Sequence, residues 1–254
     1  MAGTIRMDLN SDVGESFGRW QLGDDRALLG IVTSANVACG YHAGDPRTIS
    51  QTIALAKASG VAIGAHPSYP DLAGFGRRSM AMSGADVEAA VIYQIGAVDA
   101  IARAHGVRLT HVKPHGALYN DAARDRDLAD AIASAVRRSG GLALVGLAGS
   151  ALIDAAHAAG LRAIREGFCD RRYGRDGSLR SRDADGAVVA DPALAAQQAV
   201  EIALHHRART HDGESIDVDV DTLCIHGDTP GATAIAAAVR GALFAAGVRL
   251  APPE

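Results

Sequence analysis

The feature that most constrains the fold of this chain is a regular alternation between short apolar runs and longer segments rich in alanine and leucine. The apolar runs are short enough to be buried strands, and most of the segments between them have helical periodicity. The seven runs cover residues 4–9, 31–38, 61–65, 109–112, 142–147, 161–164 and 222–225. Strands that are separated by helices pair in parallel, because each crossover returns the chain to the same edge. The alternation therefore predicts a parallel α/β protein.

Capping signals mark the expected beginnings of four helices. An acidic or hydroxyl side chain before the first helical turn accepts hydrogen bonds from free backbone N–H groups, and proline suits the first helical position. These signals are Asp45 with Pro46, Ser83 with Asp86, Asp191 with Pro192, and Thr229 with Pro230.

Seven strand–helix units in 254 residues favour one (β/α) barrel domain over residues 1–254, with about seven parallel strands. The barrel is expected to be distorted or incompletely closed, and an open doubly wound sheet is the alternative. One segment, residues 170–190, departs from the alternation and contains two Asp-Gly pairs, which favour tight turns. It is predicted to be a hairpin or ordered loop over the mouth of the barrel, or else a flexible surface excursion.

Composition limits the classes of function and location. The net charge of -4 provides no basic patch, so nucleic acid is not an expected partner. No apolar run reaches the length of about 18 residues that a membrane span needs, and the first residues pass directly into a strand instead of a signal peptide. Three widely spaced cysteines argue against a disulfide framework or a structural zinc site. We expect a cytoplasmic protein without a membrane partner.

Polar motifs follow the predicted strands. They are DLNSDVGES, ACGYHAGD, IGAHPSYPD, THVKPHGALYN and LCIHGD, and together they hold five of the ten histidines. In parallel α/β proteins the carboxyl ends of the strands meet at one end of the sheet, where ligands bind. The sequence therefore predicts that these motifs form one site.

The first motif places Asp8, Asn10 and Asp12 on one face of a strand, because side chains alternate along it. Burying them is costly unless they bind one another, a ligand or a metal. Glu15 follows at the exit of the strand. Lys113 ends another strand and is predicted to bind a substrate carboxylate or phosphate, or to form a buried ion pair with Asp12 or Glu15.

The imidazoles of His42, His66, His115 and His226 suit proton transfer or metal binding, because histidine titrates near neutral pH. The set that a divalent metal would use, if one binds, is Asp12, His42 and His66, although no HExxH-type spacing fixes it. Two neighbouring acids, Asp45 and Asp228, are instead expected to cap helices. The sequence contains neither a GxxxxGK[ST] phosphate loop nor a GxGxxG motif after a strand.

Taken together, the motifs resemble the LamB/YcsF family. The resemblance rests on DLNSDVGE, SANVACGYHAGD, VAIGAHPSYPD, YQIGA, HVKPHGALYN, LVGLAGS, REGFCDRRY and HGD, and it runs from about residue 8 to residue 247. It implies a distorted (β/α) barrel of the type found in sugar and polysaccharide deacetylases. It also implies ATP-dependent opening of 5-oxo-L-proline to L-glutamate, performed together with two further subunits, B and C.

If the chain opens a lactam, as the resemblance implies, the candidate residues have expected roles. Asp12, His42, His66 and His115 are the candidates for proton transfer, whereas Asn10, Glu15, Lys113, Arg182 and His226 are the candidates for binding the substrate. ATP is the expected co-substrate, and the partner subunits are expected to handle it because this chain lacks a phosphate loop. Two alternatives remain, namely a stand-alone metal-dependent deacetylase or amidohydrolase, and a non-catalytic subunit that binds the lactam or its partners.

Overall fold

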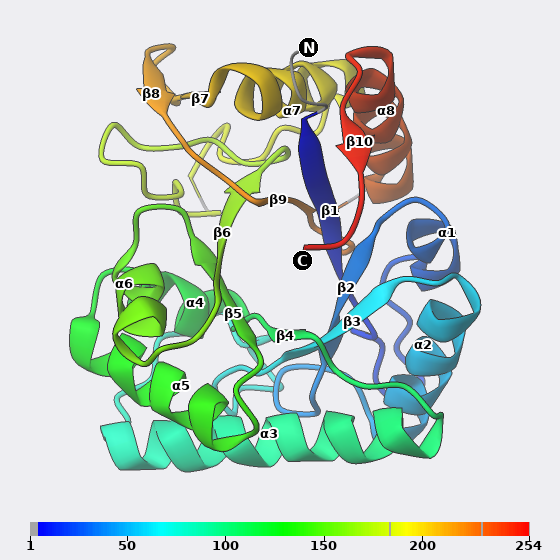
Figure 1. Cartoon of the computed structure of the whole chain (residues 1–254), viewed down its shortest axis with the longest axis vertical. Coiled ribbons are helices and arrows are strands. Elements are labelled where there is room, and N and C mark those ends of the chain that lie inside the picture. Colours follow the sequence, from blue (N-terminus) through cyan, green and yellow to red (C-terminus); the bar gives the residue numbers. More distant parts are fainter. Residues whose placement is uncertain (1–4, 183, 230, 254) are drawn as a thin grey trace.

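Seven parallel strands close into a barrel in the computed structural model, which describes residues 5–182, 184–229 and 231–253 (Figure 1). In order around the barrel they are β1 (Arg6–Val13), β2 (Ser34–Ala38), β3 (Ala62–His66), β4 (His111–Val112), β5 (Ala143–Leu147), β6 (Ala163–Phe168) and β9 (Thr222–Ile225). Strand β1 pairs with both β2 and β9, and these pairings close the ring. The predicted seven-stranded barrel is therefore confirmed, and the open-sheet alternative is wrong.

The strands differ from the predicted runs mainly at their ends. Strand β1 continues through the polar residues Asn10, Ser11 and Asp12 to Val13, and β6 continues through Glu166 to Phe168. Apolar content alone could not reveal these extensions, because the polar side chains are stabilised by partners inside the barrel. Thr4, which the first run included, lies outside the described residues.

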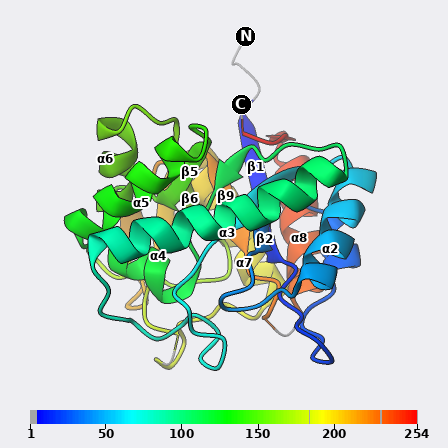
Figure 2. The same cartoon turned by 90° about the horizontal axis from the view of Figure 1, so that it is seen from below.

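Helices surround the barrel, and α3 crosses one side of it in Figures 1 and 2. The helices are α1 (Asp25–Leu29), α2 (Pro46–Ala58), α3 (Gly84–Ala104), α4 (Gly116–Ala122), α5 (Arg126–Arg138), α6 (Ala151–Ala158), α7 (Pro192–His205) and α8 (Ala232–Ala245). Neighbouring helices contact one another around the ring, as α2 with α3, α3 with α5, and α7 with α8 do.

The predicted caps of α2, α3 and α7 are confirmed, since Asp45, Ser83 and Asp191 each accept hydrogen bonds from backbone N–H groups of the first turn. The prediction for α8 was wrong. That helix begins at Ala232, later than the Thr229 signal, and Pro230 lies outside the described residues.

The inside of the barrel is largely polar, whereas its outer surface packs against the helices through an apolar core. Asp8 accepts hydrogen bonds from the hydroxyl groups of Ser34 and Thr222 at 2.7 and 2.5 Å. Higher in the barrel, Asn36 Oδ1 lies 2.9 Å from Nε2 of His111. The His111 ring fits because β3 has glycine at position 64, where a Cβ atom would lie 2.3 Å from the ring. This polar network supports the site above it.

The remaining strands lie outside the barrel. Strand β10 (Arg249–Leu250) pairs with the beginning of β1, and β7 (Arg207–Arg209) forms an antiparallel pair with β8 (Ser215–Asp217). The described residues of the 170–190 loop, 170–182 and 184–190, fold back on themselves through antiparallel bridges, Arg171 with Val188 and Tyr173 with Leu179. Loops from several strands, including β1 and β3, project together at the lower edge of Figure 2.

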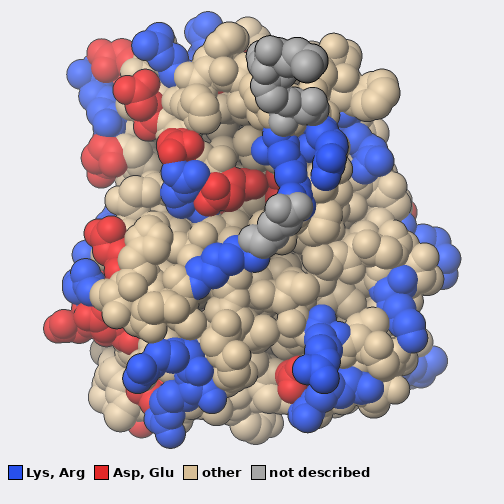
Figure 3. Space-filling model, in the orientation of Figure 1, with Lys and Arg blue, Asp and Glu red and all other residues tan. Residues whose placement is uncertain are grey.

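The surface carries charges of both signs, which are interspersed on the face seen in Figure 3. Among the described residues, no helix combines the length and the apolar character needed to cross a membrane. All three cysteines are described, and they are buried and free, in agreement with the predicted lack of disulfides.

Candidate active site

A cavity of about 260 Å³ lies at the carboxyl end of the barrel. This volume is slightly below the ~300–1,000 Å³ of typical ligand pockets, so the cavity suits a small molecule. Six of the residues predicted from sequence line it, namely Asp12, His66, Lys113, His115, Arg182 and His226. The other three, Asn10, Glu15 and His42, are buried but do not line it.

Lys113 forms the buried ion pair that was one of its two predicted roles. Its Nζ lies 3.0 Å from Asp12 Oδ1 and 2.9 Å from Glu166 Oε1, and it also contacts Asn10 Oδ1 at 3.3 Å. Burial opposes the charged ammonium, yet the charges of Asp12, Cys224 and Glu166 raise the pKa of Lys113 well above its ordinary value. Glu15, the other predicted partner, is not among its contacts. Since the N–H groups of Lys113 already have acceptors, they are poorly placed to bind a substrate carboxylate.

Asn10 supports this ion pair from below. Its amide nitrogen donates to Glu166 Oε1 at 2.9 Å and to the Thr222 hydroxyl at 2.8 Å. The structure thus gives Asn10 a clear part in positioning Glu166 and, through it, Lys113.

His66 connects Asp12 to the other histidines. Its Nδ1 lies 2.7 Å from the backbone oxygen of Lys113, which can only accept, so Nδ1 carries the proton and Nε2 carries the lone pair of the neutral ring. Nε2 lies 3.3 Å from Asp12 Oδ2. Although burial opposes ionisation of Asp12, the neighbouring His66 and Lys113 hold the pKa of its carboxyl group well below its ordinary value. Asp12 is therefore an anion beside an imidazole, an arrangement that suits proton transfer.

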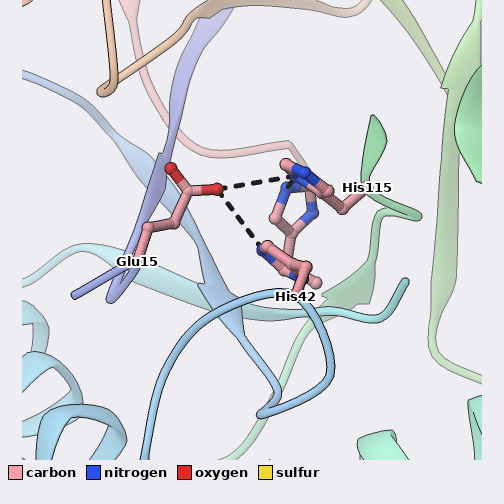
Figure 4. A group of neighbouring side chains, drawn as sticks. Glu15, His42 and His115 are labelled. Atoms are coloured by element: carbon pink, nitrogen blue, oxygen red, sulfur yellow. Dashed lines mark hydrogen bonds and ion pairs between the residues drawn. The ribbon is translucent and has the colours of Figure 1, made fainter. Parts of the chain in front are cut away.

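Behind this pair lies a buried cluster formed by Glu15, His42 and His115 (Figure 4). Glu15 Oε1 lies 3.4 Å from His42 Nε2 and 3.5 Å from His115 Nδ1. The two imidazole rings stack with their centroids 3.8 Å apart. Burial lowers the pKa of both histidines well below the ordinary value, and it raises the pKa of Glu15 well above it, with help from the negative charge of Asp12.

His226 forms a second acid–imidazole pair at the cavity, with Asp170. Its Nδ1 lies 3.0 Å from Asp170 Oδ2, and its ring stacks on Phe168 with centroids 5.4 Å apart. Burial lowers the pKa of His226, although Asp170 opposes that effect. Nearby, Asp228 pairs with Arg77 and approaches Arg182 at 3.7 Å, so the prediction that it caps α8 was wrong.

Arginines supply most of the positive charge around the cavity. Arg171, Arg180 and Arg182 reach it from the 170–190 loop, and Arg77 and Arg124 reach it from two other segments. The Nε atoms of Arg171 and Arg180 and the Nη2 atom of Arg182 are buried without a hydrogen-bond partner among the described residues. Burial and the charge of Arg182 lower the pKa of Arg171 to about 10. Unpaired guanidinium donors of this kind are suited to a carboxylate or phosphate.

Among the described residues, two groups of side chains, all buried except the partly exposed His226, bring potential metal-binding atoms within 4.8 Å of one another. One contains Glu15, His42, His66 and His115, and the other contains Asp12, Cys224 and His226. The set considered from sequence, Asp12 with His42 and His66, is split between these groups.

Sequence reasoning missed several residues of the site. Glu166 and Asp170 were overlooked because both lie beyond the predicted apolar run of residues 161–164, although they belong to the REGFCDRRY motif on which the family resemblance rests. Four arginines, Arg77, Arg124, Arg171 and Arg180, were also missed. Arginine is common on protein surfaces, so nothing in the sequence distinguished them.

The fold and the site define an α/β-barrel protein with a polar, small-molecule cavity at the carboxyl ends of its strands. The sequence profile of the LamB/YcsF family matches residues 7–254, and the chain belongs to this family. A protein of Chloroflexus aggregans, named as the A subunit of 5-oxoprolinase, is 53% identical over 251 residues, covering 98% of this chain and 100% of that protein. A Bordetella pertussis protein of the same name is 52% identical over 245 residues, covering 96% and 97%.

The fold is also similar to that of a solved structure. The crystal structure of the lactam utilization protein from Thermus thermophilus superposes with a TM-score of 0.91 at 49% identity, and the alignment covers 97% of this chain and 99% of that one.

Proposed function

We propose that this chain is the A subunit of an ATP-dependent 5-oxoprolinase, which opens the lactam of 5-oxo-L-proline to L-glutamate in the cytoplasm together with subunits B and C. Relatives that are named as this subunit, at 51 to 53% identity over nearly the whole chain, support the proposal. The observation that carries it is the composition of the cavity. It combines the anionic Asp12 and two imidazoles, His66 and His115, with unpaired arginine donors.

The two parts of the substrate match these two sets of groups. A small lactam with one carboxylate suits a cavity of about 260 Å³. Its carboxylate would bind the guanidinium groups of Arg171, Arg180 and Arg182, since Lys113 is engaged with Asp12 and Glu166. The lactam bond would then lie toward Asp12, His66 and His115, where proton transfer is possible.

The reaction breaks an amide C–N bond that is unreactive without activation. Transfer of a phosphoryl group from ATP to the lactam oxygen makes the ring carbon susceptible to water. The water oxygen bonds to that carbon and gives up a proton to a base, the C–N bond breaks, and the ring nitrogen takes up a proton from an acid. The product of this step is γ-glutamyl phosphate, and a second water hydrolyses its acyl phosphate bond to release phosphate and L-glutamate. His66 and His115 line the cavity and are the candidates for these proton transfers. Asp12, 3.3 Å from His66, stabilises the protonated imidazole, and His42 stacks on the ring of His115 and supports it.

The division of labour between subunits follows from the missing phosphate loop. We propose that the partners phosphorylate the lactam and that this chain performs the hydrolytic half. Glutamate release from 5-oxo-L-proline and ATP should therefore require all three subunits. Full activity of the isolated chain with ATP would contradict this division.

Variants of the assembled complex test the catalytic role. General acid–base groups contribute about 10²- to 10⁴-fold to a rate, so His66→Gln and His115→Gln should each reduce kcat by at least ~100-fold. The matched control is His105→Gln, because His105 follows α3 and hydrogen-bonds to Ser50 away from the cavity. If the complexes assemble and all variants retain the activity of the control, the chain is a non-catalytic scaffold instead.

The buried cluster of Glu15, His42, His66 and His115 favours a second candidate function, a stand-alone metal-dependent deacetylase or amidohydrolase. Such an enzyme would hydrolyse an amide without ATP or partner subunits, and a chelator would abolish its activity. An absolute requirement for ATP would exclude it.

A further inference from the structure

Glu15, His42, His66 and His115, of which the last two line the cavity, form a cluster with facing atoms that can only accept hydrogen bonds when the histidines are neutral. His66 donates its Nδ1 proton to the backbone oxygen of Lys113 at 2.7 Å. His115 donates its Nε2 proton to the backbone oxygen of Phe75 at 2.9 Å. The two remaining ring nitrogens, His66 Nε2 and His115 Nδ1, face each other at 3.0 Å, and both carry lone pairs in the neutral rings. A cation between them, a proton or a metal ion, would resolve this conflict.

Two further members of the cluster are buried without hydrogen bonds. Neither ring nitrogen of His42 has a hydrogen-bond partner among the described residues, and the same is true of Glu15 Oε1. Both side chains are nearly inaccessible to solvent. A buried polar atom without a partner is costly, by about 1–3 kcal/mol, so these atoms are expected to have a ligand in the working protein.

Three of the donor separations are close to those around a tetrahedral ion, and the rings of His42 and His115 would have to turn from their stacked arrangement to point at it, because parallel rings 3.8 Å apart do not share a plane. Metal–nitrogen and metal–oxygen bonds of about 2.0–2.2 Å at tetrahedral angles place neighbouring donors about 3.3–3.6 Å apart. The separations here are 3.4 Å from Glu15 Oε1 to His42 Nε2, 3.5 Å from Glu15 Oε1 to His115 Nδ1, and 3.0 Å from His115 Nδ1 to His66 Nε2. One donor atom from each residue can be chosen so that all lie within 4.8 Å of one another.

We propose that Glu15, His42, His66 and His115 bind one divalent cation of the borderline class, such as Zn²⁺, at the inner wall of the cavity. Three imidazoles and one carboxylate are the donors that this class prefers, and backbone carbonyls orient two of the rings as outer partners orient metal-bound histidines elsewhere. A bound ion supplies positive charge beside the cavity. With the ion bound, His66 and His115 are ligands instead of the proton-transfer groups named above, and Asp12 is the nearest remaining base. The losses of activity expected for His66→Gln and His115→Gln would then arise from loss of the ion. The proposal concerns the site of the proposed function but does not depend on lactam opening, because cation binding is measurable without a substrate.

The test is metal binding by the full chain after dialysis against a chelator. Calorimetry with Zn²⁺ should give one site per chain, and Co²⁺ should give the intense visible bands of a tetrahedral site. Thiolate-to-cobalt absorption in the near ultraviolet should be absent. Glu15→Gln and His42→Gln should each weaken binding by at least ~100-fold, since even loss of an outer partner costs 10- to 100-fold. Zn²⁺ should also raise the Tm of the wild-type chain but not that of Glu15→Gln.

Matched variants separate this site from the neighbouring group of Asp12, Cys224 and His226. His226→Gln and Cys224→Ser should bind the metal as the wild-type chain does. Thiolate-to-cobalt absorption, or loss of binding only in these two variants, would place the ion in the neighbouring group and overturn the proposal. Weak uptake at several sites that Glu15→Gln leaves unchanged would also overturn it, as would no saturable binding by the wild-type chain. Because these outcomes are independent of glutamate release, a failure here is distinguishable from a failure of the proposed function.

Discussion

Replacement of Lys113 by methionine should strongly destabilise the fold. Methionine retains much of the unbranched stem but removes the charge, which leaves two carboxylates without their shared partner. Lys113 Nζ lies 3.0 Å from Asp12 and 2.9 Å from Glu166, and the three side chains are 3%, 5% and 0% exposed, so water cannot replace the lost contacts. Two charge-assisted hydrogen bonds of about 1.5–3 kcal/mol each give about 3–6 kcal/mol. This sum agrees with the cost of breaking a buried ion pair, which is about 3–5 kcal/mol.

The measurement is the free energy of unfolding from urea titrations of the isolated chain, with two-state behaviour checked by two probes. We expect Lys113→Met to lose about 3–5 kcal/mol, which corresponds to a fall in Tm of about 6–20 °C for a chain of this size. Arg126→Met is the control, because Arg126 pairs with Asp130 on the exposed face of α5 and should contribute little.

A rescue variant tests the reasoning directly. If the loss arises from uncompensated charge, neutralising both carboxylates in Lys113→Met/Asp12→Asn/Glu166→Gln should recover most of the stability, since removing all members of a buried network is far less costly than removing one. A loss below about 1 kcal/mol in Lys113→Met would show that the buried ion pair does not stabilise the fold. A triple variant that is no more stable than Lys113→Met would show that uncompensated charge is not the cause of the loss.

Three further predictions concern pH, packing and substrate binding. Burial lowers the pKa of His111 to about 3, so from pH 6.5 downward the unfolded chain binds a proton that the folded chain does not, and stability falls with pH. Between pH 6.5 and 5 this group should contribute a loss of about 1.6 kcal/mol, and urea titrations of His111→Asn at both pH values should show a loss smaller by that amount. An unchanged pH dependence would contradict this. Gly64→Ala places a Cβ atom 2.3 Å from the ring of His111 and should cost about 1–3 kcal/mol in thermal or urea unfolding. Gly96→Ala, a control in α3 with nothing within 4 Å, should be neutral or stabilising, and equal effects of the two substitutions would refute the packing argument. Arg182→Ala should raise the KM for 5-oxo-L-proline by about 10- to 100-fold in the assembled complex, which matches a lost charge-assisted hydrogen bond. Arg175→Ala, whose guanidinium pairs with Asp212 outside the cavity, should leave KM unchanged, and an equal KM for both variants would exclude carboxylate binding by Arg182.

Much of the fold was predictable because its signals are local. A strand or a helix shows in the spacing of apolar residues over a few positions, and a cap such as Asp45 needs only the next turn of chain. The end of the barrel that carries the site was also predictable, because parallel strands place their carboxyl ends together. The boundaries of β1 and β6 were not predictable, since Asn10 and Glu166 are stable in strands only through partners that come from elsewhere in the chain.

The sequence by itself determined the order of the elements, the barrel and the group of ionisable residues at one end of it. The tertiary structure decided which of these residues meet. It paired Lys113 with Asp12 and Glu166 instead of Glu15, and it brought Glu15 to His42 and His115. Alternation along a strand gives the face of a side chain but not its partner across the barrel. That partner depends on how the strands close into a barrel, and the closure of the barrel is set by packing over the whole chain.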